Sequence, residues 1–366
     1  GQLRNVFNPF LKSRCRMELS SLNPDQRQAV RTVDGPLLIL AGAGTGKTRV
    51  ITSRVAYMIS RGIRPRNILA VTFTNKAARE MKERVKSLVP KRRLVGEDGQ
   101  TEKPTICTFH SLCVRILRRH ITKLGYKKNF VIYDATEQLG VVRRILSQIS
   151  LGSKKPDPYA VLSLISRWRN SNSDELIAED QDLAALAKHL VATYQQTLKA
   201  SNAVDFDDLI LLVLRLFAEC PEALDECRER YRYIMVDEYQ DTNSSQFELV
   251  HSLAREHRNF CVVGDDDQSI YGWRGAEVAN LLDLDKYFPD VKVVKLEQNY
   301  RSTNTILGAA NAVIKNNVQR REKKLWSNKG AGEPITLWEF RDDEEEAQAL
   351  VEEINFNRSI KKVKWR

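Results

Sequence analysis

The stretch Ala41-Gly42-Ala43-Gly44-Thr45-Gly46-Lys47-Thr48 constrains the fold of this chain more than any other. It follows the apolar run 36–40 and leads into 49–59, where apolar residues recur at helical spacing. A strand, a glycine-rich loop and a helix in this order are typical of a phosphate-binding loop. Glycines let successive backbone N–H groups point at one anion, and the helix N-terminus adds partial positive charge. We expect Lys47 to reach terminal phosphates and Thr48 to bind Mg²⁺, although Ala41 replaces the usual first glycine. The alternative is a plain glycine-rich turn.

The charge balance narrows the choice of partners. The 366 residues carry a net charge of +11, which favours a polyanionic partner, nucleic acid before membrane, over a basic protein without one. No apolar run approaches the roughly 18 residues of a membrane span, and the basic leader 1–18 has no signal-peptide pattern. The 6 cysteines are scattered without a Cys-x-x-Cys pair, which favours reduced thiols in the cytoplasm over zinc or disulfides.

Short apolar runs followed by polar turns and helical patterns indicate further strands. They occupy 67–73, 105–110, 233–238 and 259–265. Strands that alternate with helices predict an α/β fold with a parallel sheet, whose ligands bind at the carboxyl ends of the strands.

A helical region and a second α/β segment complete the organisation. Between residues 134 and 199 the pattern is helical almost throughout, with helices expected at 137–149, 159–169 and 183–198. We interpret this region as a subdomain inserted into the α/β domain. We expect strands at 291–296 and 334–340, an acidic helix over 342–354 and the beginning of a further strand at 363–366. These elements indicate the start of a second sheet domain.

Two strand ends carry residues suited to phosphate chemistry. Asp237 and Glu238 end an apolar strand, so Asp237 is a candidate Mg²⁺ ligand and Glu238 a candidate base for the attacking water. Gln268 follows another strand and can contact the γ-phosphate. The nearby Tyr271 and Trp273 predict a platform on which bases stack, rather than core residues, because glycines and Arg274 surround them.

Eight motifs in order resemble the UvrD/PcrA/Rep family of superfamily 1 DNA helicases from about residue 19 onward. They are Leu22–Gln26, 41–48, Thr72–Ala78, Thr108–His110, Asp205–Asp208, Val236–Asp241, 263–276 and Gln298–Ser302. The resemblance implies a 3′→5′ translocase that couples ATP hydrolysis to unwinding. It also implies two RecA-like domains, the first formed by 19–117 and 200–290 around the helical insertion 118–199, the second begun by 291–366.

The resemblance also implies the ATP site. Gln26 would read the adenine edge, Arg49 and Tyr300 would flank the base, and Arg301 would act as an arginine finger. The implied catalytic residues are Lys47, Asp237, Glu238, Gln268 and Arg301, with Thr48 and Asp237 on Mg²⁺. The implied ATP-binding residues are Gln26, Ala41, Gly42, Ala43, Gly44, Thr45, Gly46, Lys47, Thr48, Arg49, Tyr300 and Arg301.

Single-stranded DNA and junctions of single and double strands are the implied partners, together with repair or replication loading proteins, for a monomer or weak oligomer. The implied DNA-binding residues are Phe73, Thr74, Asn75, Thr108, His110, Tyr271, Trp273 and Arg274. For His110 a structural role is an equal alternative. We interpret the charged run 320–324 as a solvated face or as weak phosphate contacts.

The family pattern continues with motifs that this sequence lacks, so we expect an N-terminal motor fragment that binds ATP and DNA, hydrolyses slowly and does not unwind. Three alternatives stay open: a subunit of a helicase–nuclease, a nucleotide-gated single-strand-binding module, and a P-loop kinase that acts on small molecules. DNA-stimulated turnover would distinguish the helicase from the last two.

Overall fold

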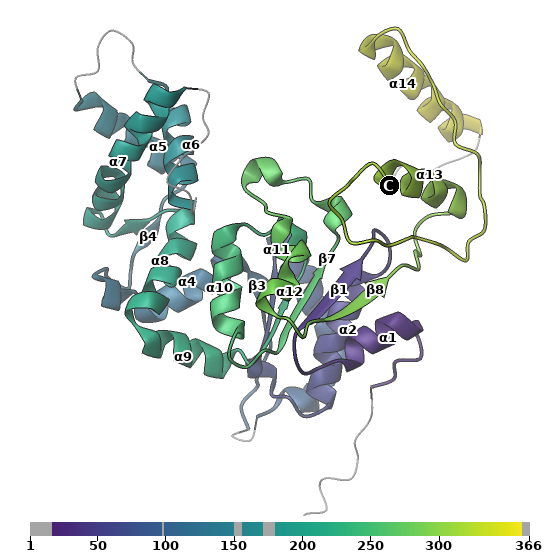
Figure 1. The fold of residues 1–366 in the computed structure, drawn as a ribbon, viewed down its shortest axis with the longest axis horizontal. Coiled ribbons are helices and arrows are strands. Elements are labelled where there is room, and N and C mark those ends of the chain that lie inside the picture. The colour runs from purple at the N-terminus through teal and green to yellow at the C-terminus, as the bar shows by residue number, and fades with distance from the viewer. Residues whose placement is uncertain (1–16, 97–98, 150–155, 171–179, 361–366) are drawn as a thin grey trace, which may run out of the picture.

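The main parallel sheet lies at the centre of the computed structural model, which describes residues 17–96, 99–149, 156–170 and 180–360. Its 6 strands run in the order β3-β2-β6-β7-β1-β8 (Figure 1). The strands are β1 (Leu37–Ala41), β2 (Ile68–Thr72), β3 (Thr105–Thr108), β6 (Tyr233–Val236), β7 (Phe260–Gly264) and β8 (Lys292–Leu296). The predicted α/β fold with a parallel sheet is confirmed.

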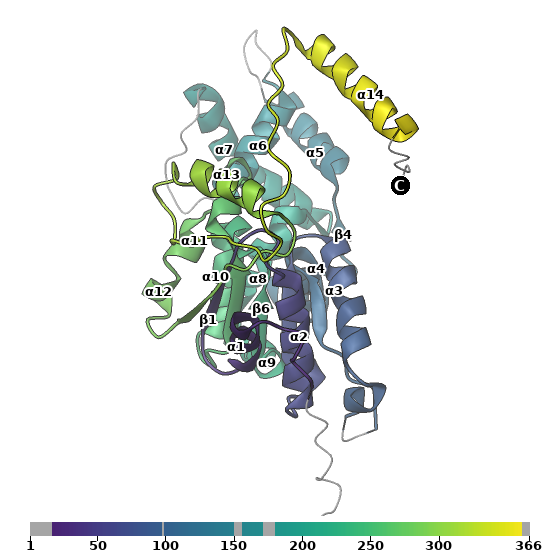
Figure 2. The same cartoon turned by 90° about the vertical axis from the view of Figure 1, so that its right-hand side faces the viewer.

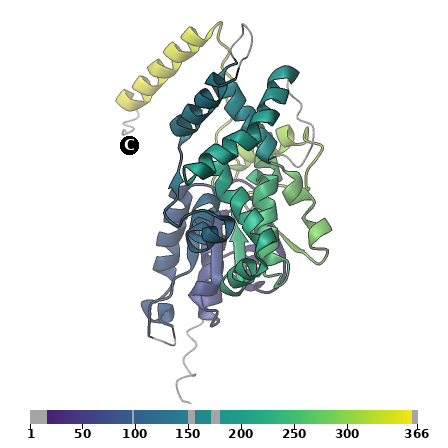
Figure 3. The same cartoon turned by 90° about the vertical axis from the view of Figure 1, so that its left-hand side faces the viewer.

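Helices cover both faces of the sheet, as Figures 2 and 3 show from opposite sides. One face carries α1 (Pro24–Arg31), α2 (Lys47–Ser60) and α3 (Asn75–Leu88); the other carries α4 (Phe109–His120), α8 (Phe206–Glu219), α9 (Pro221–Arg230) and α10 (Ser244–Ala254). In β1, Leu38 and Leu40 enter one core, while Leu37 and Ile39 enter the other. Burial on both faces explains why β1, β2 and β7 are nearly continuous apolar runs in the sequence.

The inserted helical subdomain stands beside the sheet at the upper left of Figure 1. Its helices α5 (Ala135–Ser147), α6 (Pro158–Asn170) and α7 (Gln181–Ala200) enclose a separate apolar core around Tyr194. The predicted helical character of this region is confirmed. The short parallel pair β4 (Val131–Ile132) and β5 (Ala203–Val204), which the sequence did not predict, lies where the chain enters and leaves the subdomain.

A buried ionic cluster fastens this subdomain to the sheet domain. Arg169, in the last turn of α6, pairs with Asp205 at 2.6 Å and with Asp208 at the start of α8. Tyr194 of α7 donates its hydroxyl to Asp205 at 2.9 Å. All of these ion-paired side chains are almost fully buried. Burial raises the pKa of Asp208 to about 6, against the opposing effect of Arg169.

The strand predicted at 291–296 exists, but it does not begin a second sheet. It is β8, which pairs in parallel with β1 from Leu37 opposite Lys292 to Ala41 opposite Leu296. The first sheet therefore extends past residue 290, where we expected the first domain to end. The sequence pattern could not predict that β8 pairs with β1, because a strand can pair with any neighbouring strand that satisfies its backbone hydrogen bonds. The predicted domain boundaries, the one at residue 290 included, stay predictions.

The strand predicted at 334–340 is wrong. These residues pair with no strand among the described residues, and Leu337 is 90% exposed. Alternation is not enough for a strand, because unpaired backbone groups need a neighbouring strand. The acidic helix that follows is α14 (Asp343–Ile360), which contains no buried residue, and Figures 1 and 2 show it away from the sheet. The strand suggested at 363–366 and most of the basic leader lie outside the described residues.

The rest of the chain is short helices and connections. They include α11 (Ala279–Leu282), α12 (Leu284–Tyr287) and α13 (Asn304–Ile314). No described helix is long and apolar enough to cross a membrane.

Candidate functional site

The glycine-rich loop connects β1 to α2, as its sequence predicts. Gly44 and Gly46 have φ angles of +70° and +91°, which cost a residue with a side chain about 1–2 kcal/mol each. A Cβ atom on Gly44 would lie 2.7 Å from the side-chain nitrogen of Asn299. Thr45 donates its hydroxyl to the carbonyl of Gly42 at 2.7 Å, which closes the turn. Both the backbone and its neighbours therefore require glycine here.

Lys47 and Glu238 meet across the carboxyl edge of the sheet. The lysine Nζ lies 2.7 Å from Glu238 Oε2. Glu238 follows β6 with a left-handed φ of 50°, and Gln240 Nε2 donates to the same carboxylate at 3.0 Å. The Gln240 Oε1 accepts from the backbone N–H of Asp265 at 3.0 Å. Side chains thus connect the phosphate loop with the ends of β6 and β7.

Two carboxylates beside this pair carry raised pKa values. Burial, and next the charge of Glu238, raise the pKa of Asp237 to about 6. The same causes in the same order raise the pKa of Asp241 to about 6. The site therefore concentrates more negative charge than Lys47 neutralises.

These residues fit a bound Mg²⁺ ion. Asp237 is 7% exposed, and a buried carboxylate with a raised pKa is a group that a divalent cation would stabilise. Thr48 lies in the first turn of α2, next to Lys47. A hydroxyl and a carboxylate are both oxygen ligands of the kind that Mg²⁺ prefers.

The residues expected around the base lie together on the α1 side of the loop. Gln26 is buried; its Nε2 donates to the Thr45 carbonyl at 2.9 Å and its Oε1 accepts from the Asn23 N–H at 3.1 Å. Asn23 also donates to the hydroxyl of Tyr300 at 2.9 Å. Arg49 donates to the Ser21 carbonyl at 3.0 Å. In this structure Gln26 supports the loop, which its motif position did not predict.

The segment after β8 lies directly against the phosphate loop. Asn299 donates to the Ala43 carbonyl at 2.6 Å, and the Tyr300 N–H donates to the Gly44 carbonyl at 2.9 Å. The Asn299 Oδ1 accepts the N–H groups of Arg301 and Ser302 at 2.8 and 2.7 Å. Asn299, which sequence reasoning left without a role, therefore positions the backbone of Arg301 beside the loop.

The acidic turn after β7 binds a second part of the chain. Lys323 Nζ lies 2.8 Å from Asp265, 2.7 Å from Asp266 and 2.6 Å from Asp267. Arg320 donates two hydrogen bonds to Asp267 at 2.9 and 2.8 Å. The three carboxylates have the spacing of a cation site, and the lysine ammonium occupies it.

We name this contact the acidic clasp: Asp265, Asp266 and Asp267 with Arg320 and Lys323. The charged run 320–324 is thus only partly the solvated face that we considered, since Lys323 is 7% exposed while Glu322 and Lys324 are exposed. Hydrogen bonds from Arg320 and Lys323 outweigh burial and lower the pKa of Asp267. Gln268, the candidate γ-phosphate contact, follows the clasp and donates its amide to Asp265.

The candidate DNA residues occupy the ends of β2 and β3 and the segment after β7. Phe73 is half-buried, 5.5 Å from Phe109 between ring centroids, while Thr74 and Asn75 are exposed at the start of α3. Trp273 is 75% exposed, which argues against a core role. Tyr271 is 39% exposed. The side chain of Arg274 lies outside the described part of the chain.

Thr108 and His110 are more enclosed. Thr108 is buried and caps α4 by accepting from the Ser111 N–H at 3.2 Å. His110 packs edge-on against Phe206 at 5.7 Å, and burial lowers its pKa against the opposing charge of Asp207. Both residues therefore have structural roles, and their contact with DNA stays a prediction.

Comparison with known proteins agrees with this arrangement. Residues 22–289 match the UvrD/REP helicase N-terminal domain, and residues 294–364 match the UvrD-like helicase C-terminal domain. The ATP-dependent DNA helicase PcrA of Staphylococcus aureus is 47% identical over 341 residues, which cover 92% of this chain and 46% of the relative. PcrA of Staphylococcus epidermidis is 46% identical over 343 residues, with the same coverage.

The chain thus spans about half the length of the curated relatives it matches. The first match alone covers well over half of the chain and contains both the phosphate loop and the Asp237–Glu238 pair. The motifs, the parallel sheet and the convergence of the site residues at its carboxyl edge point the same way. The chain belongs to the UvrD/REP helicase family.

Proposed function

We propose that this chain is the motor part of an ATP-dependent DNA helicase that moves 3′→5′ along single-stranded DNA. The observation that carries the proposal is the Lys47–Glu238 contact of 2.7 Å beside buried Asp237. A phosphate-binding lysine, a candidate metal ligand and a candidate base meet at one sheet edge, as ATP hydrolysis requires. The names of the PcrA relatives support DNA as the partner, and the polarity follows from the resemblance.

Each residue has a stated task in this proposal. Lys47 leaves Glu238 and binds the terminal phosphates, and the freed Glu238 carboxylate accepts a proton from the attacking water. Mg²⁺, held by Thr48 and Asp237, would offset phosphate charge. Gln268 and Arg301 contact the γ-phosphate from two sides.

The adenine would lie beside Gln26, between Arg49 and Tyr300. Tyr300 is 44% exposed and therefore has a ring surface accessible to a base. The DNA strand would cross the ends of β2 and β3 and stack on Tyr271 and Trp273.

We propose weaker activity for the 366 residues than for the helicases they resemble. Among described residues 297–360 there is one isolated β-bridge, between Gln298 and Trp326, and no strand. Segment 298–302 and the side chain of Leu325, which lies against Gly42, face the phosphate loop from the far side. Slow hydrolysis without unwinding is therefore expected, since transition-state charge must be stabilised from both sides. A cytoplasmic location, a monomer or weak oligomer, and loading by repair or replication proteins belong to the same proposal.

ATP turnover with and without single-stranded DNA tests the proposal, with Lys47→Ala as the control. DNA-dependent turnover that Lys47→Ala abolishes would support a coupled motor and contradict slow hydrolysis. Salt-dependent DNA binding with nucleotide binding but little turnover is the expected result. Nucleotide binding without any DNA binding would overturn the helicase assignment for this chain.

A further inference from the structure

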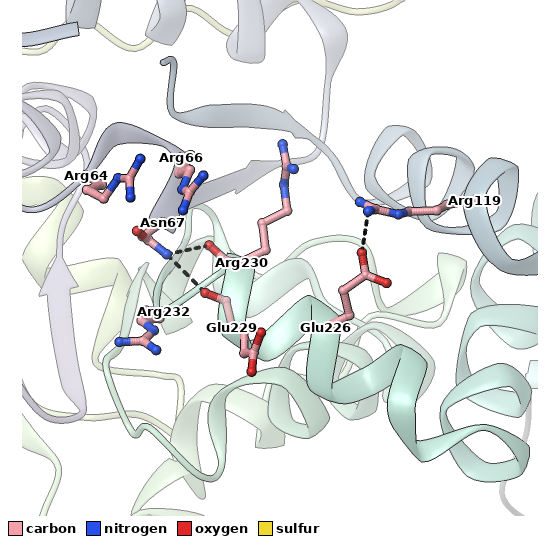
Figure 4. Close-up of a pocket in the computed structure, with 8 residues that line it drawn as sticks. All are labelled: Arg64, Arg66, Asn67, Arg119, Glu226, Glu229, Arg230 and Arg232. Carbon is pink, nitrogen blue, oxygen red and sulfur yellow. Dashed lines mark hydrogen bonds and ion pairs between the residues drawn. The ribbon is translucent and has the colours of Figure 1, made fainter. Parts of the chain in front are cut away.

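A second, basic hollow lies at the opposite edge of the sheet from the phosphate loop. It is a cavity of about 450 Å³, with 5 arginines in its lining: Arg64, Arg66, Arg119, Arg230 and Arg232 (Figure 4). Arg64 and Arg66 precede β2, while Arg230 and Arg232 precede β6. Because β2 and β6 are parallel neighbours, the cavity lies at their amino ends. We call it the arginine pocket.

The arginine pocket has more positive charge than its own carboxylates neutralise. Arg64 and Arg66 both pair with Glu102, and Arg119 pairs with Glu226 at 2.6 Å. Among the described residues, neither Arg230 nor Arg232 has an ion-pair partner. The exposed Arg230 reaches into the space between Arg66 and Arg119 in Figure 4. Two guanidinium groups are thus available to an anion.

The wall that carries these two arginines is held in place. Asn67 Nδ2 donates to the carbonyls of Glu229 and Arg230 at 3.0 and 3.2 Å, which fastens the end of α9 to the segment before β2. The Arg230 guanidinium lies over the Tyr231 ring at 5.6 Å. A guanidinium placed in advance loses less entropy when it binds a carboxylate or phosphate.

The lining of the pocket favours an extended ligand whose negative charges are unevenly spaced. A second hollow of about 190 Å³ shares Arg119, Glu226 and Arg230 with the first. Its further lining residues are Arg115, Ile116, His120, Cys227 and Tyr231. Among the described residues, no aromatic side chain lines the arginine pocket itself, although single-stranded nucleic acid is usually held by stacking. Tyr231 and His120 line the second hollow, but Tyr231 is 4% exposed and the His120 side chain 11%, so neither offers an open ring face to a base. Glu226 and Glu229 would repel an evenly charged phosphate backbone, whereas a peptide can place its carboxylates around them.

We propose that an acidic segment of a partner protein binds in the arginine pocket, and that its carboxylates form bidentate ion pairs with Arg230 and Arg232. Glu226 is the competitor of this segment. Glu226 pairs with Arg119 and also lies 3.3 Å from His120. A carboxylate of the acidic segment that reaches Arg119 therefore has to displace Glu226 from it. The arginine pocket lies away from the candidate ATP-binding and DNA-binding residues, so this proposal does not depend on the proposed helicase function.

The test measures binding of a short fluorescein-labelled peptide of alternating Glu and Ser to the full chain by anisotropy. Arg230→Glu with Arg232→Glu should weaken binding by about tenfold or more, because two charge-assisted contacts become repulsive. Lys127→Glu with Lys128→Glu is the matched control, since it makes the same charge change at adjacent exposed residues. Glu226→Gln should tighten binding severalfold, because it frees Arg119.

Several results would overturn the proposal. They are no peptide binding by the unaltered chain, equal losses in both double variants, or unchanged affinity in Glu226→Gln. Selective loss of single-stranded or duplex DNA binding in the arginine double variant, with peptide binding intact, would assign the pocket to nucleic acid instead. Unaltered circular dichroism and nucleotide binding check the fold of each variant. If the double variant does not fold, two single variants test the proposal instead. Arg232→Ala should weaken peptide binding and Glu226→Gln should tighten it.

Discussion

Lys47 Nζ and Glu238 Oε2 lie 2.7 Å apart, so the lysine of the glycine-rich loop is paired with a carboxylate that follows β6. In the function proposed above, a nucleotide phosphate would replace Glu238 as the partner of Lys47. The Glu238 carboxylate would then lose its cation, so phosphate binding and release of the proposed base would be linked.

The first prediction follows from this exchange. Glu238→Gln should lower the turnover number by at least about 100-fold, because an amide cannot accept the proton. Its ATP affinity should be unchanged or higher, because the amide no longer holds Lys47 by charge. Fluorescent-nucleotide titration and phosphate release measure the two quantities. Glu248→Gln, an exposed site on α10, is the control, and normal turnover in Glu238→Gln would disprove the assigned role.

The second prediction concerns the exposed ring of Trp273. Trp273→Ala should weaken binding of single-stranded DNA by about 1–3 kcal/mol, the value of one base stacked on an aromatic ring. Trp338→Ala removes another partly exposed indole, 46% exposed in the extended segment before α14, and should leave affinity unchanged. Anisotropy with labelled oligothymidine measures both. Equal affinities of the two variants would remove Trp273 from the DNA path.

The third prediction concerns the acidic clasp. Lys323→Met leaves Asp265 and Asp266 buried without their cation and should cost about 3–5 kcal/mol of local or global stability. Lys324→Met, at the exposed neighbouring position, should cost less than about 0.5 kcal/mol. Urea unfolding and limited proteolysis across 320–329 report the two effects. Similar behaviour of both variants would show that the clasp adds no stability.

The fourth prediction is a pH dependence at the buried cluster of α6 and α8. The pKa of Asp208 is about 6 in the folded chain, against 3.8 for an unperturbed aspartate, so the folded state favours the protonated form. Its contribution to stability is therefore full below about pH 3.8 and is lost as the pH rises from there through 6. Asp208→Asn has no such group to titrate.

The stability of the unaltered chain relative to Asp208→Asn should thus increase by about 1–3 kcal/mol between pH 7 and pH 4. Urea unfolding at a series of pH values measures this difference. A difference that does not change with pH, or that changes in the opposite direction, would contradict the raised pKa.

The local elements were predictable because each carries its signal within a few residues. The helix at Pro24 has Asn23 as a cap, and the phosphate loop has glycines where φ is positive. The partners of a strand are a different matter. The sequence of Val291–Leu296 does not indicate that this segment pairs with Leu37–Ala41. The sequence of 334–340 likewise does not reveal that the segment lacks a neighbouring strand among the described residues.

The candidate site shows the same division. The motifs predicted that Lys47, Asp237 and Glu238 share one site, and the structure places Lys47 against Glu238 beside buried Asp237, while their roles in phosphate chemistry stay a prediction. They missed Lys323, since a lysine in a charged run has no local feature that distinguishes burial from exposure. They also missed the support that Gln26 and Asn299 give to the loop, because both use backbone carbonyls as acceptors. Such contacts depend on where the chain returns in space.

The pairing of β8 with β1 has a mechanical consequence. The phosphate loop leaves the sheet at Ala41, and the segment that carries Tyr300 and Arg301 leaves it at Leu296, directly opposite. Both are anchored in adjacent strands and joined again through Asn299, so no slack tether separates them. Any shift of the phosphate loop would therefore be passed directly to Tyr300 and Arg301, through the paired strands and the Asn299 hydrogen bond, rather than through a flexible linker.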